Sequence, residues 1–503
     1  MWFSKKTNPR RTQLRRGIAA ERFSKISMLV NTEIIGSCLL WLAFTAAASF
    51  VLSFDAIFQG KYIKVISTII IVMILSLAGA IYINHYQRRI VKNQTRAMAL
   101  CILFVLLLSM CKIGLVLSGH LSWLTATAVA AAIILSIAYD QRFAIGMSML
   151  YCLFASFCIF KITSINLFLI MAAGAITCCF SLREIRTRMK LLEVSATAAA
   201  IVLITSASLD FLSDNPNPAI IFKNAGWHGA AALLVGVLIQ SLLPLIEKGF
   251  RIATSMTLLD YSDANQPLLR RLAMEAPGTF SHCLLVGSIA EAAAESIHRN
   301  GLLCRVGAYY HDIGKINKPG YFVENEMGSA SRHKELSPAM SQLIIVGHVK
   351  DGVEMAKEYK LPAVLRQFID THHGTMLVEY FYNEALKKQD QKQSPPSENE
   401  FRYVGPKPKT KEAAIVMLAD ASESAARSLP DPTLPKIEAL VHNMAMKRLQ
   451  DGQFDECDLS LRELSQIETS LSKSLAAHYH GRIPYPTQIE ELKQKTEDAA
   501  EDQ

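Results

Sequence analysis

The sequence predicts an all-α protein with two parts, a polytopic helical membrane region followed by an all-helical soluble domain. Long apolar runs crowd the first half of the chain, whereas apolar residues in the second half recur at helical spacing between polar ones. The second half contains no alternating pattern long enough to predict a sheet. Of the 503 residues, 51% are apolar, which is more than a soluble enzyme of this length usually contains.

Eight apolar segments are long enough to cross a membrane, because each has close to the roughly 20 residues that span about 30 Å of hydrocarbon as a helix. They cover residues 34–54, 62–83, 97–118, 121–139, 143–161, 165–182, 191–211 and 226–246. The fourth, fifth and sixth are short. We therefore expect a first transmembrane helix, 34–54, followed by a seven-helix transmembrane region, 62–246, in contact with the lipid bilayer.

Positive charge predicts the orientation of these helices, since Lys and Arg concentrate in cytoplasmic loops. The basic N-terminal segment 1–33 carries eight Lys and Arg, and the loops 84–96 and 183–190 carry four each. The alternate loops carry one or none. We expect a multi-pass protein of the cell (plasma) membrane with both termini in the cytoplasm. The net charge of +8 is explained by this topology, so we do not expect the chain to bind a nucleic-acid polymer.

The sequence of the second half predicts three parts: a juxtamembrane connector at 247–280, a helical domain at 281–487 and a charged tail at 488–503. Helical patterns cover residues 281–299, 302–312, 336–348, 351–359, 362–372, 375–388, 410–428, 434–451 and 460–479. The polar, proline-interrupted stretch 387–400 predicts a mobile loop. Ten cysteines without a C-x-x-C pair argue against a disulfide framework or a zinc ribbon.

Histidines and aspartates at the margins of apolar helices form the candidate site of this domain. They are His282, His311, Asp312, His348, His372, His373 and Asp420. An unpaired imidazole is costly in apolar surroundings, so several together favour a shared metal site over separate structural roles. The other histidines do not belong to such a set of candidate ligands. We interpret them as surface or packing residues: His85, His120, His228, His298, His333, His442, His478 and His480.

The candidate ligands favour a particular class of metal centre. Imidazole and carboxylate suit Mn, Fe or a similar octahedral ion, whereas sulfur ligands would favour zinc. Two such ions need about twelve ligand positions, of which five imidazoles, a terminal aspartate, a bridging aspartate and a bridging hydroxide supply about ten. About two positions stay open for phosphate oxygens. The pattern therefore predicts two divalent transition metal ions able to hydrolyse a phosphodiester.

At these residues the sequence resembles a known family. The pair His311–Asp312, with His282 before it, His348 and a second histidine pair after it, and Asp420 last, resembles the HD superfamily of metal-dependent phosphohydrolases. Longer stretches look like the seven-transmembrane HD family, the PgpH-type bacterial cyclic-di-AMP phosphodiesterases. They are APGTFSHCLLVGSIAEAAAESI, GAYYHDIGKINKPGYFVENE, IIVGHVKDGVEMAKEYKLP, HHGTMLVEYFY, GPKPKTKEAAIVMLADASESAARSL and HGRIPYP, and the resemblance covers roughly residues 250–487.

The resemblance implies an enzyme that hydrolyses the cyclic dinucleotide cyclic di-AMP to linear pApA in a bacterial cytoplasm. It implies that one metal is held by His282, His311, Asp312 and Asp420, and the other by His348, His372 and His373, with Asp312 bridging. Lys315, in the stretch HDIGK, would then bind a substrate phosphate and share a catalytic role with Asp312. The alternative for Lys315 is a solvated side chain after a helix-ending glycine.

The chain departs from the family between the first two predicted spans. Members usually carry a large extracellular domain there, whereas about seven residues, 55–61, occupy that position here. The signal that the membrane region senses is therefore not predicted. A smaller change turns the family's FRYPGPKP into FRYVGPKP, and no metal-ligand position is missing.

Other functions stay open at this point. An HD hydrolase could act on ppGpp, a dNTP or cyclic di-GMP, although the Gly-Tyr-Pro element of the cyclic-di-GMP branch is absent after His373, where the chain reads GTMLVEYF. A non-catalytic, nucleotide-binding membrane receptor is a second alternative, and the complete ligand set argues against it. A transporter is suggested only by the number of spans. The sequence also leaves open whether two copies form a homodimer.

Overall fold

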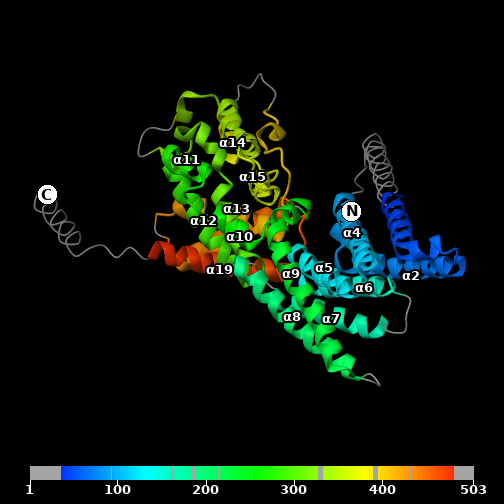
Figure 1. Cartoon of the computed structure of the whole chain (residues 1–503). Helices are drawn as coiled ribbons and strands as arrows, with labels where there is room; N and C mark the ends of the chain where they lie inside the picture. Colours follow the sequence, from blue (N-terminus) through cyan, green and yellow to red (C-terminus); the bar gives the residue numbers. More distant parts are fainter. Residues whose placement is uncertain are drawn as a thin grey trace, which may run out of the picture. The chain divides into compact units, whose positions relative to one another are not determined.

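The computed structural model describes residues 35–480 except residues 92, 160–163, 183–186, 213–215, 251, 327–331, 389–394 and 431. The predicted basic segment 1–33, the charged tail 488–503 and parts of the loops 183–190 and 387–400 lie outside the described residues. Helices dominate the described chain, whose β-structure is a single isolated bridge between Leu377 and Arg402. The predicted all-α class is confirmed (Figure 1).

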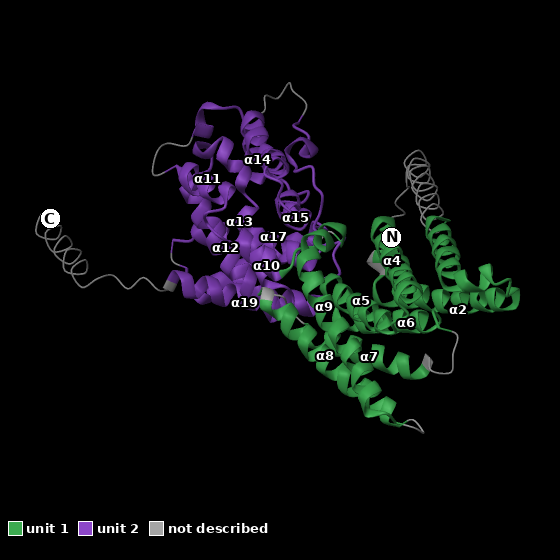
Figure 2. Cartoon of the chain, viewed as in Figure 1, with its two compact units in different colours: residues 1–254 green, residues 255–503 purple. Residues whose placement is uncertain are grey.

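The chain divides into two compact units, residues 1–254 and residues 255–503 (Figure 2). The first unit is built from long apolar helices joined by short connections. They are the helix Ile35–Phe58, α2 (Tyr62–Tyr86), α3 (Arg88–Val91), α4 (Gln94–Ser118), α5 (Ser122–Ala138), α6 (Gln141–Ser156), α7 (Ser164–Ser181), α8 (Arg188–Phe211) and α9 (Pro218–Phe250). Apart from the four-residue α3, each of these helices lies at one of the eight predicted spans.

Five helices in the described residues are long and apolar enough to cross a membrane: Ile35–Phe58, α2, α4, α8 and α9. Large apolar side chains on these helices point outward, as with Ile63, which is 83% exposed, and Leu117, which is 82% exposed. Such exposure is costly in water but suits a surface that contacts lipid. The length, the composition and the exposed faces therefore agree on a membrane region.

The three short predicted spans correspond to α5, α6 and α7, which have 17, 16 and 18 residues. At about 1.5 Å per residue they measure about 24–27 Å, slightly less than the hydrocarbon core of about 30 Å. Helix α5 packs against α4, α6, α7 and α9, and its Ala128, Ala131 and Ala132 are fully buried. Small side chains let helices in a membrane approach closely, so α5 forms the centre of this unit.

A partly buried ion pair joins the first described helix to α4. Lys112 lies inside α4 and its Nζ is 2.6 Å from Oδ2 of Asp55, which lies near the end of Ile35–Phe58. The lysine side chain is only 8% exposed, whereas that of Asp55 is 49% exposed. Because an unpaired ammonium group would be costly at such a position, the pair fixes the two helices relative to each other.

The second unit is a bundle of shorter helices. Its α-helices are α10 (Ser255–Tyr261), α11 (Pro267–Glu275), α12 (Pro277–Ser296), α13 (Gly301–Tyr310), α14 (Pro338–Glu358), α15 (Ala363–Thr371), α16 (Glu379–Lys387), α17 (Lys411–Arg427), α18 (Leu434–Gln450) and α19 (Leu461–His480). In the described residues, five 3-10 helices connect them: η1 (Ile313–Asn317), η2 (Pro319–Tyr321), η3 (Val323–Asn325), η4 (Arg332–Glu335) and η5 (Glu398–Phe401).

The hydrophobic core of this unit lies between α12, α17, α18 and α19. Helix α17 is central to it, because Ile415, Val416, Met417 and Leu418 are all buried in one continuous cluster with residues of the other three helices. A helix buried on every side has little freedom to rotate or slide. The core therefore gives α12 and α17 a fixed position, and each of them carries a candidate metal ligand.

The structure corrects two helix boundaries and adds a segment. The ranges 336–348 and 351–359 form one helix, α14, because the backbone stays helical through residues 349 and 350 between them. Helix α12 begins at Pro277, four residues before the predicted start at 281. Residues 313–325 form three successive 3-10 helices that the apolar pattern does not predict, since such short turns show no 3.6-residue period.

Gly314 allows η1 to lie against α14. A Cβ atom at this position would be 1.8 Å from the carbonyl oxygen of His348 and 2.6 Å from the backbone nitrogen of Gly352. Both neighbours are backbone atoms of a helix, which cannot move aside as a flexible side chain can. The glycine of the stretch HDIGK thus brings Asp312 and Lys315, on either side of it, close to His348.

We expect Gly314→Ala to lower the free energy of unfolding of the second unit by about 1–3 kcal/mol or more, because overpacked interiors lose stability on this scale. Gly347→Ala is the matched control, since a Cβ at Gly347 in α14 would have no neighbour within 4 Å. It should be neutral or stabilising by about 0.5–1 kcal/mol, because Ala favours a helix over Gly. Thermal unfolding of both variants measures the difference, and equal effects would contradict the close approach.

Candidate metal centre and adjoining cavity

Seven buried or half-buried side chains converge in the second unit, and they are the seven that the sequence analysis selected. His282 comes from α12, His311 and Asp312 from the end of α13, His348 from α14, His372 and His373 from the end of α15, and Asp420 from α17. They form two groups that could each hold a metal ion, with ligand atoms within 4.8 Å of one another. The first group is His282, His311, Asp312 and Asp420, and the second is Asp312, His348, His372 and His373.

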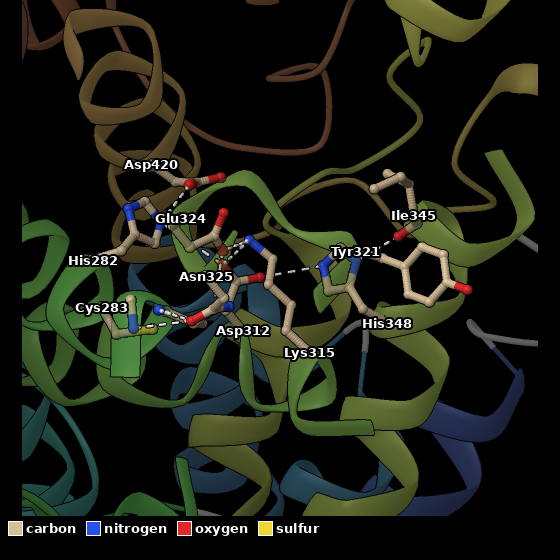
Figure 3. A network of polar contacts seen from close by, with 12 residues as sticks. His282, Cys283, Asp312, Lys315, Tyr321, Glu324, Asn325, Ile345, His348 and Asp420 are labelled. Atoms are coloured by element: carbon tan, nitrogen blue, oxygen red, sulfur yellow. Dashed lines mark hydrogen bonds and ion pairs between the residues drawn. The ribbon is translucent and has the colours of Figure 1, made fainter. Parts of the chain in front are cut away.

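Asp312 belongs to both groups, and each of its oxygens points to a different one (Figure 3). Oδ2 lies 3.3 Å from Nε2 of His311 and 3.7 Å from Nε2 of His282. Oδ1 lies 3.3 Å from Nε2 of His348 and 3.5 Å from Nε2 of His372. The carboxylate thus has the geometry of a bridge between two neighbouring ions.

The orientation of the imidazoles prepares them for metal binding. His311, His348 and His372 direct Nδ1 to backbone carbonyl oxygens, those of Ala308 at 2.6 Å, Ile345 at 2.5 Å and Ile369 at 2.9 Å. Since a carbonyl oxygen only accepts, Nδ1 carries a proton, and in the neutral ring Nε2 directs its lone pair into the site. Such outer hydrogen bonds are typical of histidine ligands in proteins.

Glu423 orients His282 in the same way, through a hydrogen bond to Nδ1. The sequence analysis missed Glu423. Its Oε2 is 2.5 Å from Nδ1 of His282, and Arg427 holds the carboxylate with NH2 2.6 Å from the same oxygen. Glu423 is buried on the same helix as Asp420, three residues further along. That spacing places both carboxylates on one helix face, which is the signal that could have identified Glu423.

Two features of the candidate ligands fit a bound metal. Some of their buried polar atoms have no hydrogen-bond partner, and their nitrogen and oxygen atoms suit a divalent ion. Among the described residues, Nε2 of His311, Oδ1 of Asp312 and Nδ1 of His373 are buried without a hydrogen-bond partner. Buried polar atoms are rarely left unpaired, and an ion is one of the partners that explains them. Nitrogen and carboxylate oxygen together suit Mn, Fe and related divalent ions.

Protonation favours the metal-binding forms of His372, His373, Asp312 and Asp420. Burial lowers the pKa of His372 and lowers that of His373 further, so both imidazoles are neutral at pH 7. Burial would raise the pKa of Asp312 and Asp420, but cationic neighbours hold both well below the usual range. Neutral imidazole and ionised carboxylate are the forms that bind metals.

His282 and His311 differ from His372 and His373. Burial would lower the pKa of His311, but the neighbouring Asp312 carboxylate raises that pKa well above its usual range. His282 is held in a similar way. Burial would lower its pKa, but the hydrogen bonds to Asp420 and Glu423 raise that pKa to about 9. The metal-free imidazole is therefore protonated at pH 7, and a metal must displace that proton to bind here.

Lys315 is buried beside the centre, so its alternative interpretation as a solvated lysine is wrong. Its side chain is 12% exposed, and Nζ lies 2.7 Å from Oδ2 of Asp312 and 2.8 Å from Oε1 of Glu324. Glu324 in turn accepts a hydrogen bond from Oγ1 of Thr279 at the start of α12. Lys315 therefore links the shared carboxylate to the segment that carries His282.

A cavity of about 660 Å³ adjoins the second ligand group, and Lys315, His348 and His373 form part of its wall. Aromatic side chains supply much of the rest: Tyr321, Phe322, Tyr380, Phe381 and Tyr403. Tyr403 stacks on His373 with ring centroids 4.3 Å apart. Pockets for small molecules usually measure about 300–1,000 Å³ and combine apolar walls with a few polar groups, so this cavity can hold a nucleotide-sized ligand.

The fold and the two ligand groups define a helical protein with a membrane region and an HD-type domain. Residues 62–254 match the family described as "7TM receptor with intracellular HD hydrolase", and residues 279–425 match the HD domain family. The two matches confirm the predicted resemblance to the seven-transmembrane HD family. The chain is thus a multi-pass membrane protein with an HD domain.

Two curated relatives carry the name cyclic-di-AMP phosphodiesterase PgpH. That of Bacillus subtilis is 42% identical over 307 residues, which are 61% of this chain and 43% of the relative. That of Listeria monocytogenes is 42% identical over 270 residues, which are 53% of this chain and 36% of the relative. The chain therefore spans less than half the length of either relative.

A solved structure, the HD domain of L. monocytogenes phosphodiesterase PgpH in complex with cyclic-di-AMP, is also similar to this chain. It is 42% identical, with a TM-score of 0.41, and the match covers 43% of this chain and all of that one.

We expect Glu423→Gln to weaken metal binding about 10-fold to 100-fold, because loss of an outer carboxylate typically costs that much affinity at a histidine ligand. Titration calorimetry with Mn²⁺ on metal-stripped protein measures the change. Glu412→Gln is the control, since Glu412 lies in the first turn of the same helix and belongs to neither ligand group. Wild-type affinity in the Glu423 variant would show that the carboxylate does not support the ligand.

Proposed function

We propose that the chain is a metal-dependent phosphodiesterase that hydrolyses cyclic di-AMP to linear pApA in the cytoplasm of a bacterium. The observation that carries the proposal is the shared carboxylate of Asp312 between two ligand groups, beside a cavity of about 660 Å³. The nucleotide is proposed from the 42% identity to two proteins named cyclic-di-AMP phosphodiesterases.

The cofactors we propose are two divalent transition metal ions, with Mn or Fe favoured by the nitrogen and oxygen donors. The group of His282, His311 and Asp420 would hold one ion, and the group of His348, His372 and His373 the other, with Asp312 shared. When bound, such a pair supplies an activated water and stabilises charge on the phosphorus oxygens.

Asp312 and Lys315 take the catalytic roles in this proposal. Asp312 is ionised, and its two oxygens fix the spacing of the two ligand groups. Lys315 keeps a cation at the cavity wall, 2.7 Å from Asp312, where a substrate phosphate would approach the centre. A cation at this place supports binding of a phosphodiester anion and holds Asp312 in orientation.

The topology and domain boundaries that we propose follow from the sequence. The Lys and Arg of the segment 1–33 and of the loops 84–96 and 183–190 favour cytoplasmic termini, which places the HD domain with its nucleotide in the cytoplasm. We propose 281–487 as the catalytic domain and 247–280 as its connector. Assembly into a homodimer stays a prediction.

We expect Asp312→Asn to reduce hydrolysis of cyclic di-AMP below detection, since the amide cannot serve as an anionic bridge. The measurement is chromatography of pApA formed by the purified full-length chain with Mn²⁺. Asp455→Asn is the control, because the Asp455 side chain is 69% exposed and pairs with Lys407 away from both ligand groups. Full activity in the Asp312 variant would exclude the proposed centre. Turnover of ppGpp or cyclic di-GMP instead would change the nucleotide but keep the chemistry.

We expect a fragment of residues 255–503 to hydrolyse cyclic di-AMP without the first unit, because all seven ligands and the cavity lie within it. Its kcat with Mn²⁺, compared with that of the full-length chain in detergent, tests this. A folded, metal-loaded fragment without activity would show that the membrane region contributes to the catalytic site.

A further inference from the structure

A tyrosine of the cavity wall, Tyr403, packs against a candidate metal ligand. Its ring stacks on that of His373, with centroids 4.3 Å apart and an angle of 29° between the planes. The backbone N–H of Tyr403 donates to the carbonyl oxygen of Met376 at 2.9 Å, three residues beyond His373. The bridge between Leu377 and Arg402 joins the same two segments. These contacts fix the Tyr403 ring relative to His373.

The hydroxyl group of Tyr403 has no hydrogen-bond partner in the part of the chain that the structure describes. Its oxygen is accessible, since the described side-chain atoms that are both sealed from solvent and unpaired do not include it. The residue as a whole is only 9% exposed, and it lines the cavity. A group that enters the cavity can therefore reach this hydroxyl group. Tyrosines in such surroundings usually have a partner for the O–H, whereas a phenylalanine would need none.

The hydroxyl group of Tyr403 also lies close to the charges of the metal centre. Burial raises its pKa above the usual value of a phenol, so the group keeps its proton at pH 7 and can donate it in a hydrogen bond. The charges that act on it include those of Lys315, Asp312 and Asp420. Lys315 lines the same cavity. The wall beside the second ligand group therefore carries two donors, an ammonium group and a phenol.

We propose that Tyr403 is a catalytic residue whose hydroxyl group donates a hydrogen bond to a phosphate oxygen of the substrate. This role rests on the proposed phosphodiesterase function and adds a neutral donor beside the cation of Lys315. A phosphodiester carries its negative charge on two non-bridging oxygens, so two donors on one wall can each serve one of them. Hydrogen bonds to an ionised oxygen are also stronger than those between neutral groups. The role explains why a tyrosine stands where a phenylalanine would pack as well.

The test uses the purified full-length chain with Mn²⁺ and removes the hydroxyl group alone. Tyr403→Phe keeps the ring that stacks on His373. Tyr382→Phe is the matched control, because Tyr382 lies outside the cavity wall and its ring contacts Phe401. The substrates are cyclic di-AMP and bis(p-nitrophenyl) phosphate, a phosphodiester without base or sugar. Titration calorimetry with Mn²⁺ on metal-stripped protein measures the metal affinity of each variant.

We expect Tyr403→Phe to lower kcat/KM about 10-fold to 100-fold for both substrates alike, since the lost hydrogen bond joins the group that they share. Its Mn²⁺ affinity should equal that of wild type, because the stack on His373 remains. Tyr403→Leu removes the stack as well and should also weaken Mn²⁺ binding about 2-fold to 10-fold, the scale of one aromatic contact. Tyr382→Phe should behave as wild type in both measurements.

Wild-type kcat/KM for both substrates in Tyr403→Phe would overturn this role of the hydroxyl group. A loss confined to cyclic di-AMP would overturn it too, since the hydroxyl group would then contact the nucleoside. So would a weaker affinity for Mn²⁺ in Tyr403→Phe, which would place its effect on the metal ligand. Wild-type protein that hydrolyses bis(p-nitrophenyl) phosphate but not cyclic di-AMP would contradict the nucleotide of the proposed function. The ratio of Tyr403→Phe to wild type with bis(p-nitrophenyl) phosphate would still decide the role of Tyr403.

Discussion

The carboxylate of Asp312 is the group on which the arrangement of the second unit depends. One oxygen faces His282 and His311, the other faces His348 and His372, and Lys315 holds the first oxygen in place. A buried carboxylate among five imidazoles would be hard to satisfy by hydrogen bonds alone, as the unpaired Oδ1 shows. Bound cations would resolve that problem, and the surrounding fold gives them fixed positions.

The fold supplies these positions through contacts far from the ions. Helices α12 and α17 are held by the hydrophobic core, and Gly314 lets η1 lie directly on the backbone of α14. Glu423 and Arg427 then orient His282 from outside the site. Together these contacts bring residues from five α-helices to one point.

The helices and the site residues could be predicted from the sequence to different degrees. Apolar period and length predicted every long helix, and the histidines beside apolar runs predicted the seven side chains that converge, because both signals are local. The single helix α14 was wrongly predicted as two helices, 336–348 and 351–359, although the backbone stays helical between them. Glu324 had no local signal, because its role depends on a contact with Lys315 that only the folded chain brings together.

The central claim is that two metal ions lie on either side of Asp312. Anomalous X-ray diffraction from crystals of the Mn²⁺-loaded protein tests it most directly. The structure leads us to expect two peaks about 3.5–4 Å apart, the usual spacing of two-metal sites, with one peak beside His311 and Asp420 and the other beside His348 and His373. A single peak, or peaks that do not contact Asp312, would contradict the account.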